Sequence, residues 1–341
     1  MFDVAIVGSG PAGATCATFC ARAGLRTLLL ERERFPREKV CGDCLNPSCT
    51  PVLGRLGIAK QLRELPHGKL QTVDFIAIGG KTISVKLPNE SEIAIKRSVL
   101  DHLLMQAAIA AGAEVRDGIT VSTIAPNESS WKINGDEAHV LVAADGRNST
   151  VARQIGLLPR IEKERVALQT HLPLPRNFGD RVVLQFLPEG YSGQAPVSGG
   201  ELNLCLVGRP RTIVSLKSWA EGAFGLTSDH QWRTITPLRR RAISPLHDRL
   251  LLVGDAARVV EPFTGEGIFY GLRSGELAAE AIIAQRLELY ADAHAELYRG
   301  RLWINRIART AVLSPRSTST LIKMNLVPPR MLRLLTSKVV L

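Results

Sequence analysis

The chain of 341 residues lacks several features that would assign it to a class at once. No run of about 18 uninterrupted apolar residues occurs, so we expect no membrane-spanning helix. The N-terminus does not have the form of a secretory signal peptide, because Asp3 interrupts it and the segment VAIVGSG serves as a strand and a loop. Internal repeats and low-complexity segments are absent as well. We therefore expect one large or two ordinary packed domains, with a fold that begins at the first residues.

Cysteine is scarce and comes without an export signal, which favours reduced thiols in a cytoplasmic protein over a disulfide framework. The six cysteines are Cys16, Cys20, Cys41, Cys44, Cys49 and Cys205. Structural zinc normally needs four ligands, and neither a second Cys-x-x-Cys nor a paired set of histidines accompanies Cys41 and Cys44. We therefore expect no metal site.

Acidic residues are missing from the end of the chain. Residues 297–341 contain nine Lys and Arg and no Asp or Glu, and they carry most of the net charge of +11. Base-stacking aromatics are almost absent there, so we expect no nucleic-acid partner. Aliphatic residues between the charges suit an anionic membrane surface or an acidic partner, which would make the protein peripheral to a membrane. A terminal helix that packs on its own domain and exposes a basic face explains the pattern equally well.

What the chain does contain begins with a Rossmann-type βαβ unit. DVAIVGSG predicts an apolar strand that runs into glycines, PAGATCATFCARAG has helical apolar spacing, and LRTLLLERE predicts a second strand. Further on, TVDFIAIGGKTISVKL alternates around Gly-Gly and predicts an antiparallel hairpin, and RLLLVGDA predicts a late strand before a long helix.

The nucleotide-binding parts come in pieces, with strand-rich segments between them. This pattern predicts an α/β fold in which a Rossmann-type FAD-binding domain is interleaved with a β-sheet substrate domain and followed by a helical C-terminal segment. The predicted FAD-binding domain comprises residues 1–45, 96–155 and 250–290, the substrate domain 46–95 and 156–249, and the basic helical segment 291–341.

The first glycine motif, Gly8-Ser9-Gly10-Pro11-Ala12-Gly13, is a G-x-G-x-x-G in the right context, directly after a strand and at the start of a helix. Gly8 permits the tight turn, Gly10 lets a diphosphate approach the backbone, and Gly13 allows close helix–strand packing. The free N–H groups of the helix start favour an anion. Glu31 at the end of the next strand, followed by Arg32 in the predicted site, suits the hydroxyls of an adenosine ribose. A carboxylate there would repel a 2′-phosphate, which favours FAD or NAD over NADP.

Three more segments resemble one family. VLVAADGRNSTVAR (140–153) and LLLVGDAARVVEPFTGEGIFYGLRSGELAAE (250–280) resemble the downstream flavin fingerprints of the FAD-dependent monooxygenase and reductase superfamily, which has the para-hydroxybenzoate hydroxylase-like fold. RFPREKVCGDCLNP (34–47) resembles its geranylgeranyl reductase-like branch, which also includes flavin-dependent halogenases. The resemblance covers most of residues 1–290 and implies FAD as the cofactor.

The resemblance also implies roles for single residues. Asp255, at the end of a strand, corresponds to the family aspartate at the ribityl chain, and Arg97 to an arginine near the FAD that suits a phosphate. A solvated arginine before a helix is the alternative for Arg97, and a simple turn is the alternative for the Asp145-Gly146 pair. A glycine turn at a helix start suits a flat ring and favours negative charge on its pyrimidine edge. The remaining predicted flavin contacts are Gly254, Pro262, Gly265, Glu266, Gly267 and Ile268.

The pair Cys41 and Cys44 admits zinc, a redox disulfide or no joint role. A thioredoxin-like disulfide needs the pair at a helix start, and Asn46 and Pro47 interrupt such a helix. The resemblance explains Cys41, Gly42 and Asp43 as a loop that reaches the flavin or the substrate cavity. We therefore take Cys41 as a cofactor-binding and candidate catalytic residue, with a substrate-side or structural role favoured over redox pairing.

The choice of reaction rests on smaller features. The Trp-x-Trp-x-Ile-Pro segment of the family's halogenases does not occur, and GEGIFYGLRSGELAAE resembles reductases. GYSGQAPVSGGELNLCLVG keeps Tyr191 and Pro196 of a reductase-like Tyr-x-Trp-x-Phe-Pro segment but lacks the tryptophan and phenylalanine, which argues against a long prenyl substrate. Tyr191 is a candidate proton donor or cavity wall.

Three functions follow from these features. The first is an FAD-dependent oxidoreductase that reduces a double bond in an apolar small molecule. The second is an FAD-dependent monooxygenase that hydroxylates or epoxidises such a molecule, and the third is a flavin-binding protein without turnover. No second G-x-G-x-x-G occurs, so NAD(P)H, if it is the electron donor, visits transiently, and otherwise a separate reductase supplies electrons.

Overall fold

The first strand, β1 (Phe2–Val7), sits at the centre of a parallel sheet because its apolar run is buried on both faces. The computed structural model describes residues 1–87, 92–159, 165–328 and 332. The sheet has the strand order β17-β18-β11-β1-β2-β8, in which every pair is parallel except β17 with β18. Its other strands are β2 (Thr27–Leu30), β8 (Glu114–Arg116), β11 (Asp136–Ala143), β17 (Leu246–His247) and β18 (Leu250–Leu252), and β10 (Ser130–Ile133) and β9 (Ile124–Asn127) extend it from β11.

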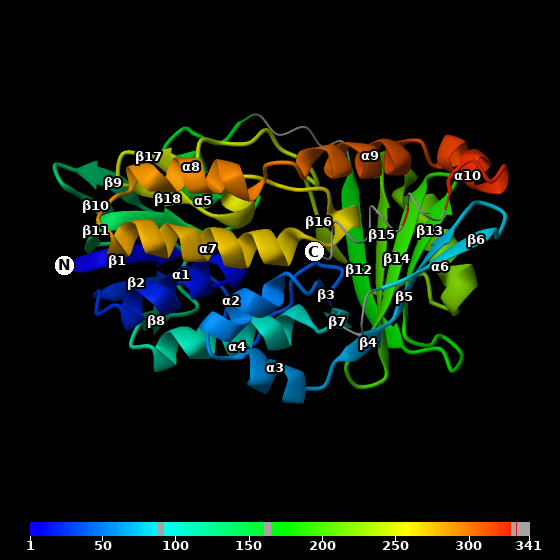
Figure 1. The fold of residues 1–341 in the computed structure, drawn as a ribbon, viewed down its shortest axis with the longest axis horizontal. Helices are drawn as coiled ribbons and strands as arrows, with labels where there is room; N and C mark the ends of the chain where they lie inside the picture. The colour runs from blue at the N-terminus through cyan, green and yellow to red at the C-terminus, as the bar shows by residue number, and fades with distance from the viewer. Residues whose placement is uncertain (88–91, 160–164, 329–331, 333–341) are drawn as a thin grey trace.

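Helices cover this sheet on one face and a small hairpin layer covers the other. One apolar cluster joins the sheet to its helices α1 (Pro11–Arg22), α4 (Arg97–Ala110), α7 (Gly267–Ile283) and α8 (Glu288–Leu297). A second cluster joins it to β9, β10 and α5 (Thr150–Gln154). This is the predicted Rossmann-type arrangement, and Figure 1 shows it as the left half of the molecule.

A seven-stranded sheet forms the other half (Figure 1). Its order is β16-β12-β15-β14-β13-β5-β6, and β5 and β6 form the hairpin predicted from the Gly-Gly turn. The strands are β5 (Thr72–Ile76), β6 (Thr82–Lys86), β12 (Val166–Pro173), β13 (Arg181–Leu187), β14 (Gly190–Val197), β15 (Glu201–Gly208) and β16 (Arg233–Ile235). Helix α6 (Ile213–Phe224), entered through the 3-10 turn η1 (Pro210–Thr212), packs on one face of the sheet.

The C-terminal helices cover the other face of the second sheet. Helices α9 (Leu302–Leu313) and α10 (Pro315–Lys323) contribute Val312 and Ile322 to an apolar cluster with Phe186 and Tyr191. In Figure 1 they lie along the upper side of this sheet. Arg330, Arg333 and Lys338 of the basic segment lie outside the described residues. Within the described part of the chain, no helix is both long and apolar enough to cross a membrane.

Three short strands connect the two halves. They are β3 (Cys44–Leu45), β7 (Glu92–Ala94) and β4 (Gly68–Leu70), in antiparallel order. The predicted division places residues 46–64 with the substrate domain, whereas α2 (Cys49–Arg55) and α3 (Ala59–Glu64) pack in one apolar cluster with α1, α4 and α7. The apolar faces of α2 and α3 therefore pack on the nucleotide-binding half. The other domain boundaries stay a prediction.

Candidate active site

The first glycine turn leaves no room for a side chain at Gly8 or Gly13. Gly8 has a φ of +104°, and a Cβ there would lie 2.6 Å from the carbonyl oxygen of Ala144. A Cβ on Gly13 would lie 1.9 Å from the carbonyl oxygen of Gly8. Gly10 is the N-cap of α1 and Pro11 its first residue, and no side chain caps the helix. The first N–H groups of α1 are therefore available to an anion.

The second glycine turn meets the first one in space. Gly254 lies in the turn η2 (Gly254–Ala256) with a φ of +54°, and a Cβ on it would lie 3.3 Å from the Cβ of Ala12. A Cβ on Gly275 of α7 would lie 2.1 Å from the carbonyl oxygen of Ala12. Helices α1 and α7 therefore approach each other at backbone distance. The two motifs fold together although most of the chain separates them in sequence.

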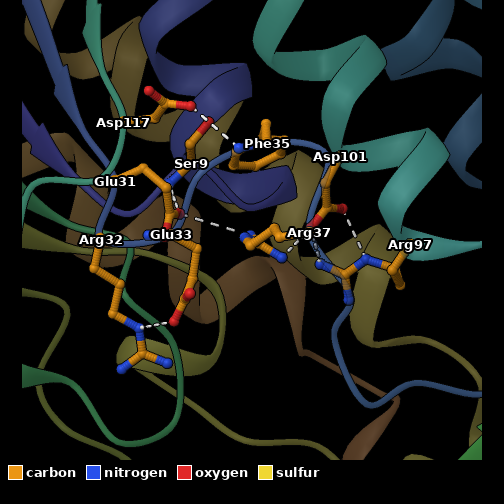
Figure 2. Close-up of polar contacts among 9 residues, drawn as sticks. All are labelled: Ser9, Glu31, Arg32, Glu33, Phe35, Arg37, Arg97, Asp101 and Asp117. Carbon is orange, nitrogen blue, oxygen red and sulfur yellow. Dashed lines mark hydrogen bonds and ion pairs between the residues drawn. The ribbon is translucent and has the colours of Figure 1, made fainter.

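Glu31 closes the first βαβ unit as a buried carboxylate (Figure 2). The Ser9 N–H donates to its Oε2 at 2.8 Å, and the Glu33 N–H donates to its Oε1 at 3.1 Å. These bonds hold the carboxylate beside the glycine turn, where it suits ribose hydroxyls. Arg32 differs, since its side chain is 72% exposed and its Nε pairs with Glu33. The predicted contact of Arg32 with the cofactor stays a prediction.

Arg97 has a buried acidic partner (Figure 2). Its Nε and Nη2 each donate to Asp101 at 2.7 Å, and Asp101 is fully buried. Arg37 adds a second guanidinium, with Nη1 3.0 Å from Asp101 and Nη2 3.7 Å from Glu31. Ideal Cβ positions on Gly10 lie 3.8 Å from Arg37 and 4.0 Å from Arg97. Two cations therefore stand beside the start of α1, where a diphosphate would lie.

Lys39 lies in the same cavity as Gly10, Arg97 and Asp255. Its Nζ is 3.5 Å from where a Cβ on Gly146 would be. Burial, followed by the nearby Arg97 and Arg37, lowers the pKa of Lys39 to about 8. Among the described residues its amine has no hydrogen-bond or ion-pair partner, so it is free to meet an anionic ligand.

The carboxylates of the downstream fingerprints point in different directions. Asp255 lines the cavity, and its Oδ2 accepts from Arg147 Nη2 at 2.9 Å. The carboxylate of Asp145 instead caps α5, accepting the N–H groups of Thr150 at 2.6 Å and Val151 at 3.1 Å. Gly146 lines the cavity with its backbone. Direct contact of Asp145 with the cofactor stays a prediction.

Helix α9 and its N-cap residue make hydrogen bonds to the turn between η2 and α7. Asn305 Oδ1 accepts the Glu261 N–H at 2.8 Å, and Asn305 Nδ2 donates to Glu266 Oε2 at 3.4 Å. Arg301 donates to the other oxygen of Glu266 at 3.4 Å. The Glu266 side chain is thus directed to α9, whereas Pro262, Gly265, Gly267 and Ile268 line the cavity. This anchoring leaves the start of α7 facing the cavity.

A buried ion pair ties the same turn to the second sheet. Arg165 donates to both carboxylate oxygens of Glu261, at 3.0 and 2.7 Å. The 3-10 turn η3 (Pro262–Thr264) then places the ring of Phe263 edge-on to Tyr191, with ring centres 5.2 Å apart. Tyr191 is buried in the cavity wall, and burial raises the pKa of its hydroxyl.

The CGDC loop is fixed by its aspartate. Asp43 has a φ of +59° and is buried, and its Oδ2 lies 2.8 Å from His171 Nε2 and accepts from Asn203 Nδ2 at 2.6 Å. Cys41, Gly42 and Cys44 line the cavity. All six cysteines are free thiols, and burial raises the pKa of both Cys41 and Cys44. Protonated thiols are poor nucleophiles, so the geometry favours a wall over a redox pair.

These pieces enclose one cavity of about 810 Å³. At one end lie Gly10, Lys39 and Arg97, and in the middle lie the CGDC loop and the turn before α7. At the other end the wall is apolar and comes from the second sheet, α9 and α10. That wall includes Val73, Phe75, Leu184, Phe186, Ile304 and Ile322.

The residues fit FAD. The free start of α1 with Arg37, Arg97 and Lys39 suits the diphosphate, Glu31 suits the adenosine ribose, and Asp255 suits the ribityl hydroxyls. The glycine turn before α7 and the CGDC loop leave a slot beside the apolar wall for the ring. When bound there, FAD supplies two-electron redox chemistry. The fold and site thus define a flavin-dependent oxidoreductase.

Comparison with known proteins agrees with this class. Residues 1–174 match the family described as FAD binding domain, and the chain belongs to this family. It is 30% identical to menaquinone reductase of Mycobacterium tuberculosis over 90% of this chain and 83% of that protein. It is 28% identical to chloroplastic geranylgeranyl diphosphate reductase of Oryza sativa over 82% of this chain and 66% of that protein.

Two further matches are of other kinds. Conditioned medium factor receptor 1 of Dictyostelium discoideum is 30% identical over 83% of this chain, which spans 63% of that protein. The solved structure of flavin-dependent brominase Bmp2 has a TM-score of 0.78 and 21% identity, with 98% of this chain and 93% of that chain covered. At that identity the likeness concerns the fold.

Several residues of the site escaped prediction from the sequence. Arg37 and Lys39 lie in the segment that resembles the reductase branch, but nothing in its spacing shows which side chains face the cavity. Asn305 lies in the basic segment, where nothing in the sequence pattern indicates a contact with the turn before α7. Glu92 follows the polar sequence PNES and precedes IAIKR, so alternation with Ala94 is the one signal that it faces inward.

Proposed function

We propose that the chain reduces a carbon–carbon double bond in an apolar small molecule, with bound FAD as the source of electrons. The observation that carries the proposal is the shape and lining of the cavity. It leads from the cationic cradle at Gly10, past the turn before α7, to an apolar wall built by the second sheet, α9 and α10. A substrate on that wall would meet the flavin ring at the CGDC loop with water largely excluded.

The relatives support an unsaturated substrate. Two of them are named for the reduction of menaquinone and of geranylgeranyl diphosphate, and both compounds carry unsaturated prenyl chains. An apolar wall of aliphatic and aromatic side chains suits such a chain. Phe75, Phe186 and Phe263 supply aromatic surface there, although the tryptophan and phenylalanine of the reductase-like segment are missing. We therefore propose prenyl-bearing lipids and quinones as the first substrates to test, and NAD(P)H as a transient electron donor.

We propose supporting roles for the two candidate catalytic residues. Tyr191 packs on Phe263 and holds its proton tightly, which supports a role in shaping the wall beside the flavin turn. Cys41 lines the cavity in the CGDC loop, and burial raises the pKa of its thiol. We propose that both position the substrate.

Anaerobic single turnover tests the proposed reaction. FAD on the purified enzyme is photoreduced without oxygen and mixed with a menaquinone or with geranylgeranyl diphosphate, while flavin absorbance is followed and the product is analysed by mass spectrometry. We expect reoxidation of the flavin and a product that gains two hydrogens in the prenyl chain. Fragmentation must locate these hydrogens, because a quinone ring can accept electrons by itself.

A different product would contradict the proposal. Reoxidation that occurs only after oxygen is admitted, with one oxygen atom added to the product, would establish the monooxygenase instead. A protein that stays reduced with every compound and never oxidises NAD(P)H would fit a flavin-binding protein without turnover. Enzyme without substrate serves as the control for slow reoxidation.

We further propose that the face formed by α9 and α10 docks on an anionic membrane surface. This α9–α10 face exposes large apolar residues between basic ones, and Ile307 and Leu321 are exposed and also line the cavity. The cavity therefore opens on this face, where an apolar substrate could enter from a lipid layer. The exposed apolar residues are Leu302, Trp303, Ile307, Leu321, Met324 and Leu326.

A further inference from the structure

Glu92 is a buried carboxylate in the wall of the cavity. It begins β7, where it is 8% exposed, and it lies opposite Leu70 of β4. No hydrogen bond or ion pair joins its carboxylate to any other described residue. Its inward direction follows from strand alternation, because Glu92 and Ala94 are both buried.

The described groups around Glu92 do not compensate its charge. The titratable neighbours that its charge affects are the thiols of Cys44 on β3 and Cys49 on α2, and both pKa values are raised further by the carboxylate. Lys69 on β4 pairs in register with Ile93 and is exposed, so it lies on the other face of the strands. Burial alone raises the pKa of Glu92 to about 7.

An unpartnered carboxyl group is costly in this position, since an apolar side chain would fill it without loss of solvation. Such groups are typical of sites that transfer protons, where a carboxyl group must be protonated near neutral pH. Burial raises the pKa of the neighbouring thiols Cys41 and Cys205 and of the Tyr191 hydroxyl above their already higher ordinary values, so these groups release protons less readily.

Asp43 does not compete for this role. Its Oδ2 is occupied by His171 and Asn203, and it does not line the cavity. Lys39 lies at the cationic end of the cavity beside Gly146. Glu92 therefore combines a lining position, a free carboxyl group and a proton available near neutral pH.

We propose that Glu92 is the proton donor to the substrate double bond, an inference that rests on the proposed reduction. The reduced flavin provides one hydride, which carries both electrons and forms a C–H bond at one alkene carbon. The Glu92 carboxyl group gives its proton to the other carbon, so that the C=C bond becomes a single bond. The carboxylate then regains a proton from water, and the flavin is left oxidised.

Single-turnover kinetics of the FAD-loaded enzyme with geranylgeranyl diphosphate or a menaquinone test this role. In the wild type, the rate of prenyl reduction should fall as the pH rises through about 7. We expect E92Q to be slower by about 100-fold or more and to lose this pH dependence, because general acid catalysis contributes about that much. E92D should recover part of the rate, and the exposed E64Q serves as the matched control.

Infrared spectroscopy gives a readout that does not depend on turnover. The wild-type holoenzyme should show a protonated-carboxyl band that is lost as the pH rises through about 7, and E92Q should lack this band. FAD content and photoreduction of E92Q should match the wild type, which shows that the variant folds.

The outcomes separate the two proposals. Wild-type prenyl reduction with an unchanged rate and pH profile in E92Q would overturn the role of Glu92 alone. Absence of the titrating band from the wild type would overturn it as well. If the wild type reduces neither compound, the proposed reaction fails and the proton-donor role fails with it.

Discussion

The sequence pattern does not indicate a role for Lys39, but its position in the structure predicts that it strengthens cofactor binding. Its amine lies at the cationic end of the cavity without a described partner, and its pKa is already lowered to about 8. A diphosphate that binds nearby would favour the charged amine. The lysine therefore keeps an unpaired charge ready for the cofactor.

We expect Lys39→Met to weaken FAD binding by about 10- to 100-fold, the effect of one lost hydrogen bond to a charged group. Because the amine of the free protein loses its proton near pH 8, wild-type affinity should fall as the pH rises above that value, and the variant should lack this fall. Titration of the apoprotein by flavin fluorescence measures both. Lys60→Met, at an exposed position, should bind like the wild type, and equal affinities of Lys39→Met and wild type would contradict the assignment.

Helix α9 does more than cover the second sheet. Through Asn305 it accepts the Glu261 N–H and donates to Glu266, the two ends of the turn that leads into α7. Glu261 is buried, so loss of the amide would leave its N–H without this acceptor, whereas Glu266 keeps Arg301 and Tyr270 as partners. The helix thus fixes the turn on which the flavin ring would rest.

We expect Asn305→Ala to lower the free energy of unfolding of the FAD-loaded protein by about 1 to 3 kcal/mol, the cost of leaving a buried polar group unpaired. Denaturant unfolding followed by flavin fluorescence measures this. Asn305→Asp keeps the acceptor for Glu261 but sets a second carboxylate against Glu266, and it should be at least as destabilising. Wild-type stability in both variants would show that the turn is held by other contacts.

For the molecule as a whole, the described basic residues of α9 and α10 share these helices with Ile307 and Leu321, which line the cavity. We expect the protein to bind vesicles of phosphatidylglycerol and to bind phosphatidylcholine vesicles far more weakly. Neutralising Arg316 and Lys323 to Gln should weaken binding by about 10-fold or more, since each basic residue near such a surface contributes about 1 kcal/mol. Added salt should weaken wild-type binding.

Co-sedimentation with the vesicles measures this, and turnover of detergent-dispersed substrate serves as the control because neither residue belongs to the FAD site. Equal binding to both kinds of vesicle would contradict the docking proposal. In that case the basic residues form a solvated face on helices that pack on their own domain.

The sequence predicted what local patterns determine. The glycines of the first turn and the apolar run of β1 impose steric and periodic constraints that act within a few residues, and the fold follows them. The family resemblance then supplied FAD and the late turn. Asp145 and Glu266 show the limit, because one caps α5 and the other reaches α9. The direction of a side chain depends on what packs against its element, and spacing along the chain does not contain that.

Glu92 and Asp43 are the opposite case, because the sequence pattern does not indicate the roles that their side chains have in the structure. The sequence drew attention to the cysteines of the CGDC loop, whereas the loop is fixed by Asp43 through partners on β12 and β15. In the sequence, Glu92 is one more charged residue beside the polar segment PNES. Its burial arises only when the short strands β3, β7 and β4 assemble between the two halves.

The attachment of Asn305 has a practical consequence for any shortened form of the protein. A chain that stops before α9 would lose the basic face, but it would also free the turn into α7 and open the apolar end of the cavity to water. Such a protein should lose FAD during purification and show little flavin absorbance. Its failure to sediment with lipid would then report a damaged flavin pocket as much as a missing anchor.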